Sequence, residues 1–184
     1  MNEIITKRLR ITLFQEKHLT QTYVNWLNDP EVVKYSSQRH FFHTLESCKK
    51  YWQNFQGSQN YFWAVETLID DNHIGNLNAY IDKINNTADV GIIIGDRKKW
   101  GQGYGLEAWN GVLKFLFKEK KIRKITAGTL EVNRGMVNIA MKAGMHEEGR
   151  RYRQEIINNK EVDLLYFGIF FEEIENAINL TNEK

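Results

Sequence analysis

Residues 89–117 read DVGIIIGDRKKWGQGYGLEAWNGVLKFLF, and this stretch decides how the rest of the chain is interpreted. The run from Val90 to Ile94 is apolar and β-branched, which is typical of a strand covered on both faces. A loop with three glycines at alternate positions follows: Gly101, Gly103 and Gly105. Apolar residues then recur at helical spacing and predict one buried helix stripe, made of Leu106, Trp109, Leu113, Leu116 and Phe117. The stretch therefore predicts a strand, a glycine loop and an α-helix in direct succession.

The glycine loop is suited to binding an anion. Glycine lets backbone N–H groups approach a ligand closely, and the first N–H groups of a helix have no partner within the helix. The helix dipole adds partial positive charge there, and Arg97, Lys98 and Lys99 add full charges nearby. Phosphate groups commonly bind at helix starts of this kind. The loop therefore predicts a ligand that bears phosphate.

One alternative phosphate ligand is a dinucleotide. Gly103-x-Gly105-x-x-Ala108 matches the dinucleotide fingerprint, but in that fold the first glycine follows the strand directly and the motif usually opens several βα units. Here the charged residues 96–99 and Trp100 intervene, and the motif lies in the middle of the chain. No glycine is followed by Lys-Ser or Lys-Thr, so the Walker motif is absent as well. A dinucleotide-binding oxidoreductase is therefore the less favoured alternative.

A second group of residues follows the predicted helix. Lys124 to Leu130 predicts a strand, and residues 133–145 predict a short helix that Asn133 caps and Gly144 ends. Together with the glycine loop, this pattern resembles the GNAT superfamily of acetyl-CoA-dependent N-acetyltransferases. Further segments, in their order along the chain, resemble the branch that contains ribosomal-protein alanine acetyltransferases: Lys7–Ile11, Trp26–Val32, Ile74–Gly75 and Glu147–Arg150.

The resemblance implies an α/β (α+β) fold: a GNAT-like mixed, mostly antiparallel sheet flanked by helices, with a splayed central parallel strand pair. We expect a single domain over residues 1–171 and a C-terminal tail over residues 172–184. Local patterns also predict a strand over 4–14 and a helix over 18–27. A second helix is expected to be capped by Thr44 and to bury a stripe of Leu45, Cys48, Trp52 and Phe55. Two hairpins are predicted, one of 61–67 with 73–81 and a last one of 150–157 with 162–171 about Asn158-Asn159.

The resemblance also implies where acetyl-CoA binds. Its pantetheine arm is expected to enter between the splayed strands and to pair, like an added strand, with the main chain of Ile92, Ile93 and Ile94. Its pyrophosphate is expected to contact Lys99 and the backbone amides of Gln102, Gly103, Tyr104, Gly105 and Leu106. By the same resemblance, the side chain of Asn133 also binds the cofactor.

Acetyl transfer needs a base that removes a proton from the amine. Asp89 is the first candidate, because members of the resembling branch commonly carry a carboxylate at the head of this strand and because burial could raise its pKa. His40 is the second candidate base, and the resemblance places Trp26, Tyr35 and Arg39 near the acceptor. The chain departs from the family pattern at Trp100, Met136, Met141 and Met145, so the proton donor for the CoA thiolate is not assigned.

Composition excludes several other classes of protein. The 184 residues carry a net charge of +2, which gives no sign of bulk nucleic-acid binding. The single cysteine, Cys48, excludes an internal disulfide and a Cys-based metal site, and the histidine spacing predicts no metal site. We find neither a signal-peptide core nor an apolar stretch of 18 residues, so we expect no membrane association and a cytoplasmic location.

The resemblance implies an enzyme that moves an acetyl group from acetyl-CoA to a primary amine by direct attack. The acceptor is a small molecule, an amino sugar or a protein N-terminus. The resembling proteins often have a Tyr and a Ser where this chain has Met141 and Met136, and the absence of both keeps open the alternative of a non-catalytic acyl-CoA-binding module. The last hairpin could pair with a second chain, so a homodimer is compatible with the sequence.

Overall fold

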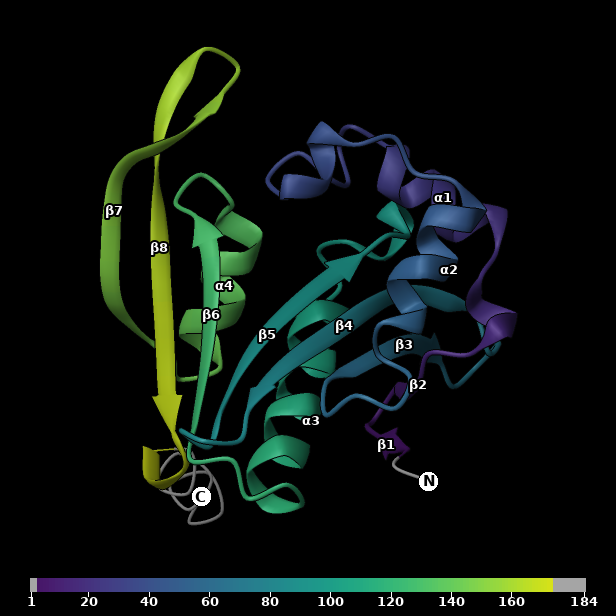
Figure 1. Ribbon diagram of the computed structural model, residues 1–184, viewed down its shortest axis with the longest axis horizontal. Coiled ribbons are helices and arrows are strands. Elements are labelled where there is room, and N and C mark those ends of the chain that lie inside the picture. Colours follow the sequence, from purple (N-terminus) through teal and green to yellow (C-terminus); the bar gives the residue numbers. More distant parts are fainter. Residues whose placement is uncertain (1–2, 174–184) are drawn as a thin grey trace. The chain divides into compact units, whose positions relative to one another are not determined.

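A computed structural model describes residues 3–173, and its eight strands form one sheet in the order β1-β2-β3-β4-β5-β6-β8-β7 (Figure 1). Strands β5 (Thr87–Ile94) and β6 (Lys124–Leu130) pair in parallel over Thr87–Asp89 and Lys124–Thr126. The pairs β1–β2, β2–β3, β3–β4, β6–β8 and β7–β8 are antiparallel. This mixed, mostly antiparallel sheet with flanking helices confirms the expected fold class.

The chain divides into two compact units. The first comprises Met1–Tyr80 with Gly91–Val112, and the second comprises Ile81–Val90 with Leu113–Lys184. The expectation of a single domain over residues 1–171 stays a prediction. From residue 174 onward, the expected tail lies outside the described residues.

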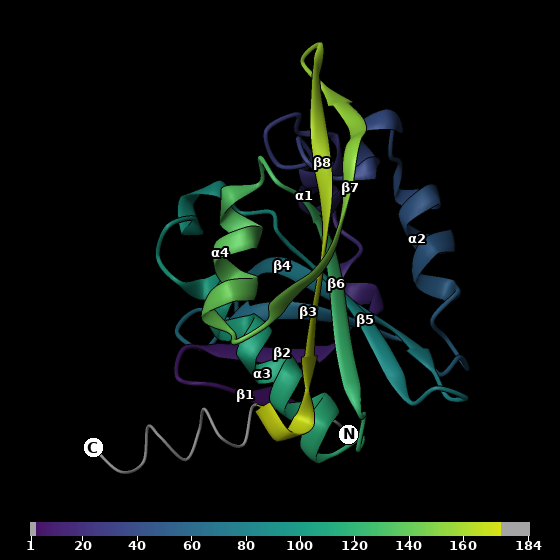
Figure 2. The same cartoon turned by 90° about the vertical axis from the view of Figure 1, so that its left-hand side faces the viewer.

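The first unit is built on the hairpins of β1 (Ile4–Ile5), β2 (Leu9–Leu13), β3 (Tyr61–Thr67) and β4 (His73–Asp82). Helices α1 (Gln21–Asn28) and α2 (Leu45–Gln53) bury an aromatic cluster that includes Phe14, Tyr23 and Phe62. The 15-residue helix α3 (Tyr104–Lys118) begins in this unit, where Gly111 contacts Ile4 and Ile11 so closely that a Cβ would lie 3.3 and 3.5 Å from their side chains. Helices α2 and α3 therefore cover opposite faces of these strands (Figure 2).

Three short 3₁₀ helices connect the elements of the first unit: η1 (Glu16–His18), η2 (Ser37–His40) and η3 (Arg97–Lys99). The second unit contains β6, α4 (Arg134–Lys142), β7 (His146–Ile157) and β8 (Lys160–Phe170). Asn158 and Asn159 both adopt left-handed φ angles, of 50° and 61°, so they form the predicted turn of the last hairpin. This hairpin extends past the end of β6 (Figures 1 and 2).

Several predicted boundaries were wrong for local reasons. Residues 4–14 form two strands, because Thr6 turns the chain with a 2.9 Å bond from its N–H to the Leu9 carbonyl. The helix expected over 18–27 begins at Gln21, because the Thr20 hydroxyl accepts the Tyr23 N–H and caps it there. Thr44 caps α2 as predicted, but Leu45 keeps 45% of its surface exposed and lies outside the buried stripe.

The two hairpin predictions also shift at their ends. Strand β4 ends at Asp82, one residue beyond the predicted end. Strand β7 begins at His146, four residues before the predicted start, and β8 spans Lys160–Phe170 where 162–171 was predicted. The central strand, the glycine loop, α3, β6 and the Asn133-capped α4 are confirmed.

Candidate active site

The glycine loop of the first unit has the backbone shape that its sequence predicts. Asp96 caps η3 by accepting the Lys98 N–H at 3.0 Å, and the Trp100 indole N–H donates to the Ile94 carbonyl at 2.7 Å. Gly101 and Gly103 then adopt left-handed φ angles of 72° and 82°. Residues with a Cβ rarely adopt this region of φ, whereas glycine adopts it readily. These two glycines therefore allow the tight backbone turn that precedes α3.

The loop presents a row of backbone donors. Among residues 3–173 the N–H groups of Gly101, Gln102 and Gly103 have no acceptor, and helix geometry leaves the next three without one until Glu107 N–H bonds the Gly103 carbonyl at 3.0 Å. The Arg8 guanidinium lies 4.1 Å from the Tyr104 ring centre and donates to the Gln102 carbonyl at 3.0 Å. These exposed donors and nearby cations can bind a phosphate.

A half-buried carboxylate in the first turn of α3, that of Glu107, fixes the helix start. Glu107 accepts hydrogen bonds from the Thr6 hydroxyl at 2.7 Å, the Arg8 N–H at 2.7 Å and the Arg8 Nε at 2.6 Å. Burial raises the pKa of Glu107, but these hydrogen bonds and the Arg8 charge outweigh it and hold the pKa below its usual value. The interaction spans about a hundred residues of sequence, and we did not predict it.

Glu107→Ala is expected to lower the free energy of unfolding by about 2–3 kcal/mol at pH 7, because the Arg8 N–H, Arg8 Nε and the Thr6 hydroxyl lose the carboxylate to which they donate. Since the folded-state pKa is depressed, this stabilisation is present above the unfolded-state pKa and is lost as the pH falls through the folded-state value. Urea unfolding at pH 7 and at pH 3 measures it. Glu46→Ala removes an exposed pair with Lys50 and should change stability very little; equal losses in both variants would contradict the anchoring role.

The predicted pantetheine residues continue β5 in the first unit. Ile92, Ile93 and Ile94 are each half-buried. Ile93 packs against the aromatic cluster of α1 and α2, so strand alternation directs Ile92 and Ile94 toward the other face. That their main-chain groups bind the pantetheine arm of acetyl-CoA stays a prediction.

The second unit contains the predicted base. Asp89 lies opposite Thr126 in the parallel register of β5 and β6, and the Thr126 hydroxyl donates to Asp89 Oδ2 at 2.8 Å. Asp89 keeps exposed surface, while its strand neighbours Ala88 and Val90 are buried. Partial burial raises the pKa of Asp89, and the Thr126 hydrogen bond offsets part of that rise. A carboxylate with a raised pKa is suited to general base catalysis.

Asn133 in the second unit acts as the predicted helix cap. Its Oδ1 accepts the Met136 N–H at 3.3 Å, and its Nδ2 donates to the Thr129 hydroxyl at 3.1 Å. These bonds fix the orientation of the amide and use one lone pair and one hydrogen. The remaining hydrogen and lone pair can still bind a ligand.

The predicted acceptor residues and His40 lie on or next to α1 and η2, two elements that contact each other. Tyr35, Arg39 and His40 lie within or next to η2, where His40 is exposed and Arg39 Nη1 donates to the Ser36 carbonyl at 2.8 Å. Trp26 lies on α1 and is buried against Gly95, the residue that follows β5. Next to it is a pocket of about 390 Å³ that the sequence did not reveal, lined by Thr22, Trp26, Asn72, His73, Asp96, Lys98, Lys99 and Gln102.

Two kinds of feature are absent from the part of the chain that the structure describes. Between residues 3 and 173, no three His, Cys, Asp or Glu side chains are grouped so that they could hold a metal ion. No helix in the same part of the chain has the length and apolar character needed to cross a membrane.

Comparison with known proteins shows which family the chain belongs to. The family model for the acetyltransferase (GNAT) domain matches residues 8–146. A probable N-acetyltransferase of Bacillus subtilis, YjcK, is 29% identical over 123 residues, which cover 64% of this chain and 67% of that protein. An uncharacterized N-acetyltransferase of the same organism, YnaD, is 28% identical over 170 residues, covering 92% and 98% of the two chains.

Solved structures show the same fold. A GNAT-family acetyltransferase of Bacillus anthracis superposes with a TM-score of 0.79 at 25% identity, covering 94% of this chain and all of that one. The Vibrio cholerae spermidine N-acetyltransferase, solved with CoA and spermine, gives 0.83 at 20% identity, covering 93% and 100%. The ribosomal-protein-S5-alanine acetyltransferase of Vibrio fischeri gives 0.80 at 17% identity, covering 94% and 98%. The chain belongs to the GNAT acetyltransferase family.

Proposed function

We propose that the protein transfers an acetyl group from acetyl-CoA to a primary amine. The observation that carries this proposal is the glycine loop, whose unpartnered N–H groups open α3 beside Arg8 and Lys99 in a chain of the GNAT family. Acetyl-CoA offers a pyrophosphate, which is the kind of anion that such a loop binds. NAD also offers one, so the proposal needs a test that separates the two ligands.

Each part of acetyl-CoA would meet a different group of residues. The amides of Gln102, Gly103, Tyr104, Gly105 and Leu106, with Lys99, would hold the pyrophosphate. Main-chain groups of Ile92, Ile93 and Ile94 would hold the pantetheine amides as an added strand would. Asn133 would contribute its remaining amide hydrogen.

The chemistry requires positioning and the removal of two protons from the acceptor nitrogen. Once the first proton has left the ammonium, the neutral amine attacks the thioester carbonyl, the C–N bond forms, and the C–S bond breaks to release the CoA thiolate. The second proton leaves the nitrogen as the amide forms, and its net destination is the CoA thiolate. The Asp89 carboxylate would take the proton from the ammonium, and a backbone N–H of β5 would stabilise the oxyanion. His40 is the alternative base, and Tyr35 and Arg39 would contact the acceptor.

The acceptor is proposed at the level of a primary amine, on a small molecule, an amino sugar or a protein N-terminus. Relatives of this fold support that class, since one is named for spermidine and another for the alanine of a ribosomal protein. Acetyl-CoA is available in the cytoplasm, so we place the protein there. A homodimer through the last hairpin is also part of the proposal.

A thermal-unfolding scan with acetyl-CoA tests the cofactor. At 100 times the dissociation constant, a ligand stabilises the folded state by about 2.7 kcal/mol. For a chain of 184 residues this should raise Tm by roughly 5–10 °C. Acetyl-CoA and CoA should give the shift and NAD should not. A shift with NAD alone, or none with millimolar acetyl-CoA, would overturn the proposal.

Turnover separates an enzyme from a binding module. The release of CoA thiol is followed with a small polyamine, an amino sugar and a peptide with a free N-terminal alanine. We expect release with at least one of these amines. Binding of acetyl-CoA without release for any of them would favour the non-catalytic acyl-CoA-binding module.

A further inference from the structure

Helix α1 packs through Trp26 on Gly95, the residue between the end of β5 and Asp96, the N-cap of η3. The Trp26 indole lies so close to Gly95 that a Cβ at this glycine would be 2.0 Å from Trp26 Cδ2 and would overlap the ring. Only 9% of Trp26 is exposed. Gly95 therefore leaves space for Trp26, and the contact fixes the spacing between α1 and the last residues of β5.

His73 holds Trp26 from another side. The two ring centres are 5.0 Å apart in an edge-on arrangement, with 66° between the planes. His73 Nε2 lies 3.0 Å from both the Gly75 carbonyl and Asn76 Oδ1, and because a carbonyl only accepts, Nε2 carries the hydrogen. Burial lowers the pKa of His73 to about 4, so the ring is neutral at pH 7.

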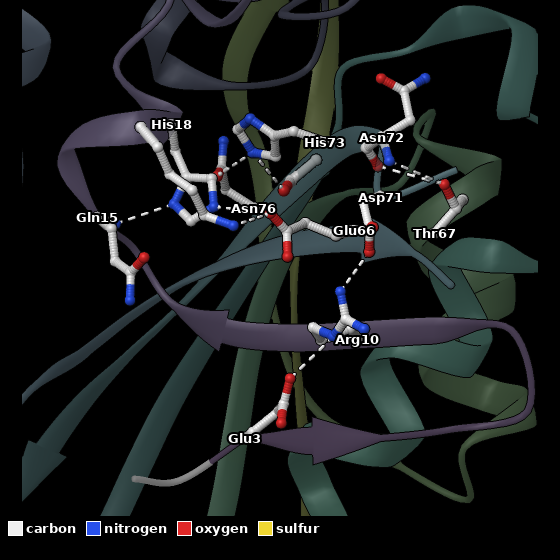
Figure 3. Close-up of polar contacts among 12 residues, drawn as sticks. Glu3, Arg10, Gln15, His18, Glu66, Thr67, Asp71, Asn72, His73 and Asn76 are labelled. Atoms are coloured by element: carbon white, nitrogen blue, oxygen red, sulfur yellow. Dashed lines mark hydrogen bonds and ion pairs between the residues drawn. The ribbon is translucent and has the colours of Figure 1, made fainter. Parts of the chain in front are cut away.

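A buried polar cluster keeps His73 in place. His18 and His73 have ring centres 5.1 Å apart, and His18 Nε2 lies 3.1 Å from Glu66 Oε1, so the two imidazoles and the carboxylate form one group (Figure 3). Lys17 pairs with the same Glu66 carboxylate. Trp26 is thus packed between a fixed imidazole and the backbone of Gly95.

Two further contacts tie the same region together. The Ile74 carbonyl accepts both the Gly95 N–H at 2.9 Å and the Asp96 N–H at 3.1 Å. Asp29, the C-cap of α1, lies 3.5 Å from Arg97 of η3. The start of η3, from which the glycine loop follows, is therefore held by β4 through hydrogen bonds and by α1 through Trp26 and Asp29.

We propose that Trp26 is a positioning residue for the phosphate-binding loop. The indole fixes the path of the backbone between the end of β5 and the start of η3. It thereby determines where the N–H groups from Gly101 to Leu106 point. A displacement of about 1 Å at a binding site can cost as much as 100-fold in activity even when its cause is distant. This inference rests on the proposed function, because the loop's ligand is taken to be acetyl-CoA. It assigns Trp26 to the cofactor side, where the sequence predicts an acceptor contact.

The test compares Trp26→Leu and Trp26→Phe with Trp52→Leu. Trp52 is a matched control, because it packs on the same aromatic cluster and donates its indole N–H to the Phe14 carbonyl, and it lies on α2 away from the loop. Isothermal titration gives the Kd for CoA, and steady-state kinetics gives KM for the amine. Hydrogen exchange of the Gly95 and Asp96 amides, measured without any ligand, reports the loop start directly.

Trp26→Leu should weaken CoA binding by about tenfold or more, which corresponds to about 1.4 kcal/mol. It should leave the amine KM within about twofold and speed exchange at Gly95 and Asp96. Trp26→Phe should restore much of the affinity, and Trp52→Leu should match the loss of Tm without these effects. A raised amine KM with unchanged CoA affinity would overturn the inference, as would equal effects of Trp26→Leu and Trp52→Leu. If the wild type binds no CoA, the proposed function fails, and unchanged exchange at Gly95 and Asp96 separately rejects the positioning role.

Discussion

Gly103→Val is expected to abolish acetyl-CoA binding. The Kd should rise at least about 100-fold, which corresponds to a loss of about 2.7 kcal/mol of binding free energy. Gly103 adopts φ of 82°, which a β-branched side chain strongly disfavours. A Cβ at Gly103 would also lie 3.5 Å from Arg8 Nη2, so the valine would crowd the guanidinium next to the loop. Isothermal titration with CoA and acetyl-CoA measures the loss.

Gly57→Val provides a matched control for backbone strain. Gly57 has φ of 72°, close to that of Gly103, and a Cβ there would meet nothing within 4 Å. Both variants should therefore lose similar stability, of the order of 1–2 kcal/mol. CoA affinity should fall in Gly103→Val alone. Unchanged affinity in Gly103→Val would mean that the cofactor binds elsewhere.

The central strand, the loop and α3 could be predicted because their signals are local. A β-branched run, alternate glycines and a helical apolar stripe each depend on neighbours within a few residues. The Asn133 cap and the Asn158-Asn159 turn are local in the same sense. The resemblance to the GNAT family was confirmed by the family model over residues 8–146.

The features that were missed depend on distant residues. Glu107 lies in the first turn of α3, and nothing near it in sequence shows that Thr6 and Arg8 supply its hydrogen bonds. The burial of Trp26 on Gly95 likewise requires that α1, β4 and β5 come together, which periodicity does not reveal. Local signals located the loop, while tertiary contacts determine how it is held.

Asp89→Asn is expected to lower kcat by about 10²–10³ with CoA affinity unchanged, because general base catalysis commonly contributes a factor of this size. Asn keeps the shape of the side chain and an oxygen that can accept the Thr126 hydroxyl at its present distance of 2.8 Å. Asp82→Asn is the matched control, since Asp82 ends β4 in the same unit and should leave kcat unchanged. If Asp89→Asn kept a kcat near that of the wild type, Asp89 would not be the base, and His40 would be the remaining candidate.

The pH dependence distinguishes a catalytic Asp89 from a structural one. The base must be ionised, so kcat/KM should fall as the pH drops through the raised pKa of Asp89, and Thr126→Val should move that fall to higher pH because it removes a donor to the charged form. The pKa of Asp89 is higher in the folded state than in the unfolded state, so folding takes up a proton at pH values between these two pKa values. At pH values above both, the ionised Asp89 lowers the free energy of unfolding. Asp89→Asn should therefore raise Tm slightly at pH 7 while it removes activity. Asp82, whose pKa is lowered by its hydrogen bond with Asn85, should show the opposite sign, with stability lost in Asp82→Asn at pH 7. If Asp89 served only to stabilise the fold, the Asp89→Asn variant would not have a higher Tm than the wild type. A gain in Tm together with a loss of kcat therefore indicates that Asp89 is retained for the reaction.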